Sequence, residues 1–438
     1  MTIFFLEKKN ETMNAPGHDP PRPTGYLELI RGNRNFRQLW YGQITSLFGD
    51  WFNLIASAAL VAQLTGSGMA IGGLFVVRML APFLVSPLAG VAADRYNRKK
   101  LLILTDLIRA IIVLGFLFVR TEAQVWLLYA LTALQLSLTG VFFPTRNAIL
   151  PDIVTRRELG AANALTSATW SVMLALGAAM GGLVAGGWGV YPAFIIDSLT
   201  FLLSAFFIAR VRYHQGHQHE SDGSLAEALH QYIEGLSYLK HHPDILVITL
   251  QKAALTLFVA GAFDVLQVSV AKDVFVIGKG GGISLGLMYA VVGIGSGIGP
   301  ILARRFTGDR DRPMRVALML AYVAMAVGLL ITSSLASFGV VLFGATLRAV
   351  GGGMIWVFST QLLLHLVPNK VRGRVFSTEF AFMTLAMAIS AGTAGWALDH
   401  TSVGISGMLQ RMAGLTLLPG FLWALWFTVR GSNRTQSE

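Results

Sequence analysis

The hydrophobic positions of this 438-residue chain gather into runs of about 20 residues that recur along nearly its whole length. Because a helix rises about 1.5 Å per residue, a run of this length crosses the apolar layer of a bilayer. The pattern predicts twelve membrane-spanning helices, near residues 38–64, 69–92, 99–119, 124–146, 161–186, 191–210, 245–269, 283–305, 314–334, 337–361, 372–398 and 405–429. We therefore expect an all-α integral membrane protein.

The longest polar interruption, residues 211–244, separates six predicted spans from the other six. Its second half predicts a helix that begins after Ser224, has one apolar face and lies along the membrane surface. We predict five parts in chain order: a flexible cytoplasmic tail (1–26), an N-terminal six-helix bundle (27–212), a cytoplasmic connector (213–244), a C-terminal six-helix bundle (245–430) and a cytoplasmic tail (431–438).

The two halves resemble each other in sequence. "PLAGVAADR" ends the second predicted span and "GPILARRF" ends the eighth, and Pro300 lies 213 positions after Pro87. Likewise, "VTRRELGAAN" enters the fifth span and "VPNKVRGRVFS" enters the eleventh. Two six-helix halves related by a pseudo-two-fold axis are typical of carriers that work by alternating access.

Composition supports the membrane assignment and excludes several kinds of chemistry. The mean hydropathy is +0.60, and only 13% of residues are charged, against about a quarter in soluble domains. The chain has no cysteine, which excludes disulfides, thiolate metal sites and thiol catalysis. The histidine-rich stretch "HQGHQHE" from His214 lies in the connector, where we expect a solvated linker rather than a metal site.

The net charge of +11 reflects how the chain is oriented in the membrane, because the basic residues gather in particular loops. If the N-terminus is cytoplasmic, the inside loops hold most of the arginines and lysines between spans, as the positive-inside rule requires. We therefore expect both termini in the cytoplasm, the lipid bilayer as surroundings, and no nucleic acid partner.

One charged loop, "GVAADRYNRKK" between the second and third spans, carries Gly90, Asp94, Arg95, Arg98 and Lys99. It resembles the loop signature of the major facilitator superfamily. "RNFRQLWYGQITSLFGDWF", "FFPTRNAILPDIV", "ELGAANALTS" and "GLSYLKHHP" resemble its bacterial drug and siderophore exporter branch, which includes macrolide-efflux-type and enterobactin-exporter-type proteins.

The resemblance, from Leu27 to Val429, implies a gating latch. Asp94 would hold the N-terminus of the eleventh helix near residues 372–376, where the helix dipole favours a carboxylate. The basic residues of the loop would pair with nearby acids and close the cytoplasmic side.

Two family features are missing. In the fifth span "LGAAMGGL" has Ala178 where the family's exchange motif has proline. The arginine common in the fourth helix is absent from "LTALQLSLTG", whereas Arg348 of the tenth helix stands at the repeat-related place. We therefore expect exchange and proton coupling to be arranged differently from the best-known drug exporters.

Asp50 and Arg78 reach mid-membrane depth from opposite sides, where a lone charge costs several kcal/mol. They are predicted to pair, either as a substrate- or proton-responsive pair or as a fixed structural one. Asp106 and Arg109, spaced i and i+3, can pair on one helix face and serve gating or coupling.

Further charged residues lie in other spans of both halves. Arg348 stands deep in its span beside three glycines, where an anionic substrate group or a carboxylate could meet it. Glu379 is predicted to pair with Arg95 or Arg98. Asp197, Lys252 and Asp264 are predicted to be anchors near the membrane edges.

The chain has no G-x-x-x-x-G-K-[ST] loop and no assembled nucleophile and base, so neither an ATP motor nor an enzyme is predicted. We expect a monomeric secondary transporter without cofactor. It would export an amphipathic small molecule (drug, siderophore or related metabolite) across the bacterial inner membrane, in exchange for protons. The alternatives are an importer or uniporter of a small metabolite, and a non-transporting sensor or assembly partner.

Overall fold

A computed structural model describes residues 24–213, 225–308 and 310–435, except for the side chains of 86–91, 93–95, 225–232, 369–370 and 429–435. Most of the predicted N-terminal tail and the histidine-rich stretch from His214 lie outside the described residues.

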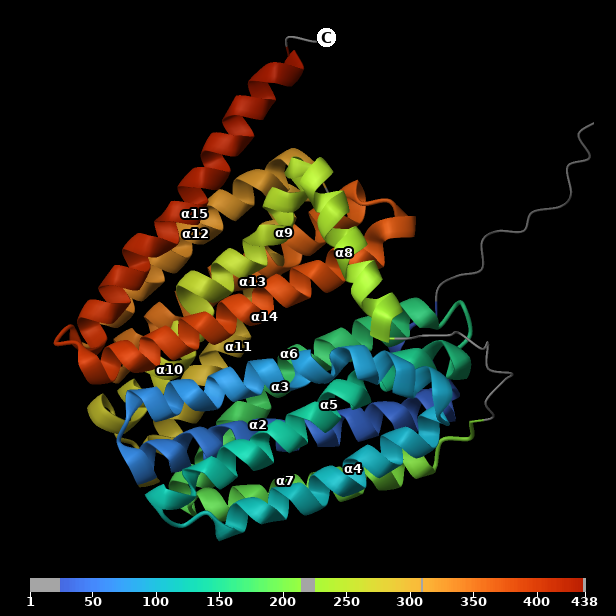
Figure 1. Cartoon of the computed structure of the whole chain (residues 1–438), viewed down its shortest axis with the longest axis vertical. Helices are drawn as coiled ribbons and strands as arrows, with labels where there is room; N and C mark the ends of the chain where they lie inside the picture. The colour runs from blue at the N-terminus through green and yellow to red at the C-terminus, as the bar shows by residue number, and fades with distance from the viewer. Residues whose placement is uncertain (1–23, 214–224, 309, 436–438) are drawn as a thin grey trace, which may run out of the picture.

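Every regular element in the described part of the chain is helical (Figure 1). The first half contains α1 (Tyr26–Gly32), α2 (Arg34–Thr65), α3 (Gly68–Arg95), α4 (Arg98–Gly115), α5 (Val125–Ile153), α6 (Leu159–Gly187) and α7 (Val190–Ala209). After these come α8 (Leu225–His241), α9 (Pro243–Leu255), α10 (Gly261–Ser269), α11 (Gly282–Thr307), α12 (Asp311–Ser333), α13 (Phe338–Leu366), α14 (Asn369–His400) and α15 (Gly404–Thr435).

The predicted all-α membrane fold is confirmed. Within the described residues, eleven helical stretches are long and apolar enough to cross a membrane. One of them, Pro243–Val274, joins α9 and α10 through a π-helical turn at Thr256–Ala260. The 32-residue α15, which packs along α12, supplies the twelfth long helix of the predicted set.

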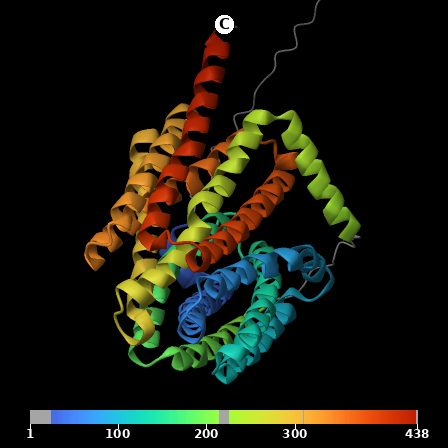
Figure 2. The ribbon, with the colours of Figure 1, turned by 60° about the vertical axis from the view of Figure 1, so that its left-hand side comes forward.

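The helices pack mainly within the two halves of the chain (Figures 1 and 2). In the first half α2 packs against α6 and α7, and α5 packs against α3 and α4. In the second half α13 packs against α11 and α12, while α14 packs against α9 and α10. The halves meet through two helix pairs, α3 with α14 and α6 with α11.

Glycines let the halves approach closely at one end. A Cβ on Gly182 of α6 would lie 2.5 Å from the Cα of Gly286 on α11, and a Cβ on Gly72 of α3 would lie 2.7 Å from the backbone oxygen of Ala391 on α14. No side chain fits at such distances, so only glycine allows these contacts. They lie toward the ends that the charge pattern predicts to face outside, which is closed in this structure.

Asp399, near the C-terminal end of α14, fastens this closed end. Its carboxylate accepts hydrogen bonds from the backbone N–H groups of Gly68 (2.7 Å) and Met69 (2.9 Å) and from the hydroxyl of Ser67 (2.5 Å). These groups form the N-terminus of α3, where the helix dipole favours negative charge. The predicted latch has the same chemistry with the halves exchanged, because Asp94 lies at the C-terminal end of α3 and would cap α14 at the opposite end.

At that opposite end α8 runs from the second half toward the first (Figure 2) and contacts α14 and α3. Glu234 of α8 pairs with Arg374 of α14 at 2.9 Å, and Gly235 packs against the same turn of α14. The predicted helix of the connector is therefore present and bridges the ends of the two halves.

We expect Asp399→Asn to weaken the closed outer end, because the amide turns one of the acceptor oxygens into a donor. Losing hydrogen bonds to a charged acceptor costs about 1–2 kcal/mol, roughly a five- to thirty-fold shift toward the open form. Since the chain has no cysteine, Val76→Cys, which faces Gly392 across the α3–α14 contact, reports opening through its rate of maleimide labelling.

The matched control is Asp273→Asn, an exposed aspartate near the same end that lies 3.8 Å from Lys272. It should leave the labelling rate unchanged. Equal rates in Asp399→Asn and in the parent protein would show that Asp399 does not hold this end closed.

Candidate coupling and binding site

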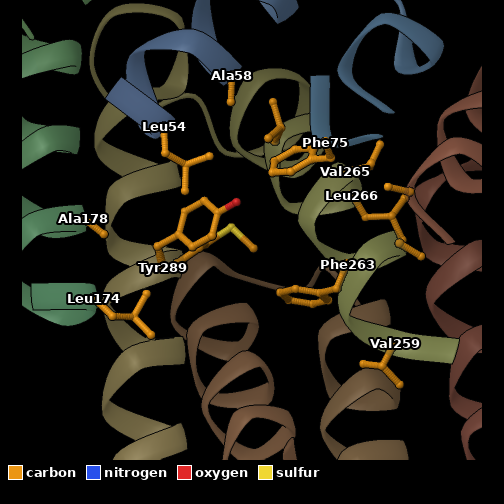
Figure 3. Packing of buried hydrophobic residues seen from close by; sticks show 14 of the residues in the cluster. Leu54, Ala58, Phe75, Leu174, Ala178, Val259, Phe263, Val265, Leu266 and Tyr289 are labelled. Atoms are coloured by element: carbon orange, nitrogen blue, oxygen red, sulfur yellow. The ribbon is translucent and has the colours of Figure 1, made fainter. Parts of the chain in front are cut away.

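Charged side chains from both halves meet inside the protein. We call this set the central charge cluster; it consists of Asp50 (α2), Arg78 (α3), Asp106 and Arg109 (α4), Asp197 (α7), Asp264 (α10), Tyr289 (α11) and Arg348 (α13). Each member lies within electrostatic reach of at least one other. The apolar residues around it, such as Leu54, Phe75 and Phe263 (Figure 3), exclude water and strengthen these interactions.

Asp106 and Arg109 form the predicted ion pair one turn apart on α4, and both are fully buried. The Arg109 guanidinium also donates to the hydroxyl of Thr139 at 3.2 Å and lies over the rings of Phe142 (4.6 Å) and Phe201 (4.2 Å). These contacts fix the guanidinium in one orientation. Whether the pair serves gating or coupling stays a prediction.

Asp50 and Arg78 do not form the predicted pair. No ion pair within 4.0 Å joins them in the part of the chain that the structure describes, and one carboxylate oxygen of Asp50 is buried without a hydrogen-bond partner. Arg78 instead lies within electrostatic reach of Asp50 and Asp197 in its own half and of Asp264 and Tyr289 in the other. The pair was predicted only from the depth of the two residues in the membrane. The directions in which α2 and α3 present the two side chains do not bring them into contact.

Asp197 is not an anchor at the membrane edge, as predicted, but a member of the cluster. It is 0% exposed, and neither carboxylate oxygen has a hydrogen-bond partner. Gly49 of α2 makes room for it, since a Cβ on Gly49 would lie 2.4 Å from its Oδ1. Asp197 lies seven residues into α7, and the predicted span, which starts at residue 191, already placed it about two turns inside.

Arg348 is buried in α13, with its guanidinium 4.0 Å from the centre of the Phe263 ring. The carboxylate within its electrostatic reach is Asp264, which also accepts a 2.9 Å hydrogen bond from the Gln267 amide. Asp264 was predicted to be an edge anchor, and the structure corrects this. The buried hydroxyl of Tyr289 points into the same region (Figure 3).

Glu379 pairs with Lys252 at 3.0 Å, and both are buried. The predicted pairing with Arg98 is wrong, since Arg98 binds Asp152 of α5 at 2.9 Å. Glu379 lies ten residues beyond Asn369, about three turns inside α14, and faces α9. Lys252 is therefore not the snorkelling anchor that was predicted; its ammonium lies 5.0 Å from the centre of the Trp356 ring.

The structure describes the side chains of only some of the predicted latch residues. The side chains of Gly90, Asp94 and Arg95 lie outside the described residues, so the predicted pairing of Glu379 with Arg95 also falls there. Lys99 is partly exposed at the start of α4. The latch remains a prediction.

Sequence reasoning missed Arg146. It ended the fourth span at residue 146, whereas α5 continues past Pro144 to Ile153 and brings Arg146 inside. Arg146 is 3% exposed and donates to Gln43 and, at 3.0 Å, to the hydroxyl of Thr166. The stretch "LTALQLSLTG" does lack an arginine, but the same helix has one further along, in the quoted stretch "FFPTRNAILPDIV".

We expect Lys252→Met to lower the melting temperature of the purified protein strongly, because it leaves Glu379 buried without its cation. Breaking a buried ion pair costs about 3–5 kcal/mol, whereas replacing both partners with apolar residues is often neutral. The double variant Lys252→Met with Glu379→Met should therefore recover most of the loss in a detergent melting assay.

The control is the Arg374–Glu234 pair, whose side chains are 35% and 36% exposed. Arg374→Gln should change stability by less than about 1 kcal/mol. A double variant less stable than both single variants would contradict this account of the buried pair.

Comparisons with known proteins agree with this architecture. The profile of the Major Facilitator Superfamily matches residues 39–391. The putative bacilysin exporter BacE of Bacillus subtilis is 27% identical over 360 residues, covering 82% of this chain and 87% of its own. Macrolide efflux protein A of Streptococcus pyogenes is 25% identical, covering 81% and 87%.

In fold, the chain is similar to the POT family transporter PepTSo (TM-score 0.71, 12% identity, 91% and 98% coverage) and to a bacterial homologue of ferroportin in the inward-facing state (TM-score 0.66, 16% identity, 89% and 98% coverage). Helices, repeat and profile match lead to one conclusion: the chain belongs to the Major Facilitator Superfamily and is a multi-pass membrane transporter, not an enzyme.

Proposed function

We propose that the protein is a secondary exporter that moves an amphipathic small molecule out of a bacterial cytoplasm in exchange for protons. Two relatives named for the export of antibiotics, a putative bacilysin exporter and a macrolide efflux protein, support the direction and the substrate class. The proposal includes a monomer in the inner membrane, with both termini cytoplasmic and six-helix bundles at 27–212 and 245–430.

The observation that carries the coupling is the charge balance of the central charge cluster. It holds four carboxylates but only three guanidinium groups; a fourth guanidinium, that of Arg146, lines the same small cavity as Asp50 but forms no ion pair with it. An unbalanced carboxylate inside a bilayer costs several kcal/mol. We take the balancing cation to be a proton, because a buried carboxylate can bind a proton without any further ligand.

Asp50 and Asp197 are the carboxylates best suited to carry that proton. They lie within electrostatic reach of each other, and each has at least one buried oxygen that accepts no hydrogen bond. Two neighbouring carboxylates favour holding one proton between them over carrying two charges. The pair would then act as one titrating unit.

Arg78 connects this unit to the movement of the halves. It belongs to the first half, yet Asp264 and Tyr289 of the second half are among its electrostatic partners. When the halves rotate, the second-half partners move relative to Arg78, and the field that Arg78 exerts on Asp50 and Asp197 changes. Proton binding and conformation are thereby linked.

An aromatic surface beside the cluster suits an amphipathic substrate. Trp51 of α2 lies against Trp170 of α6, with ring centres 6.5 Å apart, and against Tyr289, at 5.9 Å. Trp170 is 47% exposed, so part of this surface is open. We also keep the latch as part of the proposal: Asp94, Arg95, Arg98 and Lys99 would close the cytoplasmic end once the outer end opens.

The proposal is tested in everted membrane vesicles with labelled erythromycin as probe. An exporter should accumulate the macrolide inside the vesicles when a proton gradient is imposed, whereas an importer or a sensor should not. Absence of gradient-driven uptake of this probe and of a cationic dye would contradict the proposed exporter.

In the same vesicles Asp50→Asn should abolish uphill transport but leave downhill exchange measurable, because the proton carrier is lost while the substrate path remains. Asp197→Asn should behave similarly, and Asp311→Asn, in an exposed pair with His365, is the control. Uphill transport at the parent rate in Asp50→Asn with Arg78→Gln would contradict a proton-carrying role for Asp50.

A further inference from the structure

Arg146 is a buried guanidinium that faces no carboxylate. Among the described residues, its polar contacts are the side-chain oxygens of Gln43 and Thr166, both made by Nη2, and its Nε has no partner at all. Gln43 is itself held in place, since its amide nitrogen donates to the backbone oxygen of Thr166 at 3.1 Å. The arrangement fixes the guanidinium and leaves one edge of it unused.

This isolation is unusual within the protein. Arg109 pairs with Asp106, Lys252 pairs with Glu379, and Arg348 has Asp264 within electrostatic reach. A guanidinium buried in a span without an anion costs several kcal/mol. The missing anion is therefore expected to come from outside the chain.

The internal repeat shows what occupies the corresponding place in the second half. Lys252 lies 209 positions after Gln43, Trp356 lies 210 after Arg146, and Glu379 lies 213 after Thr166. These offsets agree within about one helical turn with the 213 positions between Pro87 and Pro300.

The second half thus provides both a cation and its carboxylate, Glu379. The first half provides a cation, but Thr166 stands where the carboxylate would be.

A small cavity of about 10 Å³, room for one water molecule at most, lies beside Arg146, so a larger ligand reaches the guanidinium only when the surrounding helices move apart. It is lined by Gln43, Ser46, Leu47, Asp50, Arg109, Phe142, Phe143 and Arg146. Gln43 and Asp50 are seven residues apart on α2, about 10 Å along the helix. The cavity therefore has Arg146 at one end, Asp50 toward the other, and two phenylalanine rings on its wall.

The neighbouring face of α6 is open. Asn163, Ser167 and Trp170 are exposed, and Thr166 lies on the same side of the helix as Asn163 and Trp170. A polar molecule can approach Thr166 and Arg146 along this face.

We propose that Arg146, held by Gln43 and Thr166, binds a carboxylate of the transported molecule, whose apolar part packs on Phe142 and Phe143. A guanidinium suits this because its planar fork binds a carboxylate through two N–H groups. The inference rests on the proposed function only in taking the bound molecule to be the substrate.

The test is direct binding to the purified full-length protein. The probes are N-acetylphenylalanine and 2-naphthoate, each compared with its neutral amide at millimolar concentration in a melting assay. We expect each carboxylate to raise the melting temperature by about 2 °C or more above its amide. Arg146→Gln should abolish the difference, and Arg146→Lys should reduce it.

Thr166→Glu is the decisive variant, because it supplies the carboxylate that the second half has in Glu379. It should raise the melting temperature of the ligand-free protein and abolish the response to both carboxylates. Arg120→Gln, which removes an exposed arginine that stacks on Tyr191 away from this site, controls for general effects and should keep the response. Equal responses to acids and amides in the parent protein, or an undiminished response in Thr166→Glu, would overturn the proposal.

The melting assay depends neither on a proton gradient nor on the direction in which the protein transports its substrate. Carboxylate binding through Arg146 without uptake in everted vesicles would refute the proposed exporter and leave the binding site standing. Uptake of the macrolide in vesicles, together with equal responses to carboxylates and amides in the melting assay, would refute the binding site and leave the proposed exporter standing.

Discussion

The cost of placing charge inside a bilayer governs the interior of this protein. Each buried charge must find an opposite charge, hydrogen bonds or a proton, because water is excluded. Arg109 and Lys252 have fixed partners, whereas Asp50 and Asp197 share the field of Arg78 without direct contact. Each fixed ion pair lies within one half of the protein and stabilises that half. A buried charged group without a fixed partner can change its protonation or its pairing. On our proposal, the second kind marks the region where transport is coupled.

The contacts between the halves follow a different rule. They are made by glycines that bring backbones together, by a carboxylate that caps a helix, and by a few apolar side chains such as Leu174 of α6 against Gly293 of α11. Such contacts are individually weak and re-form readily, as a carrier that alternates between two states requires. Asp399 caps the N-terminus of α3 at one end, and the proposed latch would give Asp94 the same relation to α14 at the other, so that the gate would open at one side as it closes at the other.

Hydrophobic runs were sufficient to predict the helices, since each span must satisfy its own backbone in lipid. They also showed which charges lie deep, as with Asp50 and Arg348. They did not show how each helix is rotated about its axis, and this rotation decides which charged side chains meet. For this reason Asp50 was paired with Arg78 and Glu379 with Arg98. Asp197 was taken for an edge anchor although its helix was predicted within one residue of its observed ends, so depth within the span was misjudged. Arg146 was missed because the predicted span stopped at residue 146, whereas the helix continues past Pro144 to Ile153.

Duplication gives the two halves the same frame, so differences between them indicate function. In the second half, the place that corresponds to Gln43, Arg146 and Thr166 holds a cation, Lys252, and its carboxylate, Glu379. This complete pair suits a structural role. The first half has no such pair, although completing it would require only one carboxylate in place of Thr166. A buried cation held without an anion lowers stability, and stability alone would favour completing the pair. Its incompleteness is therefore best explained by an anion that arrives and leaves during the transport cycle.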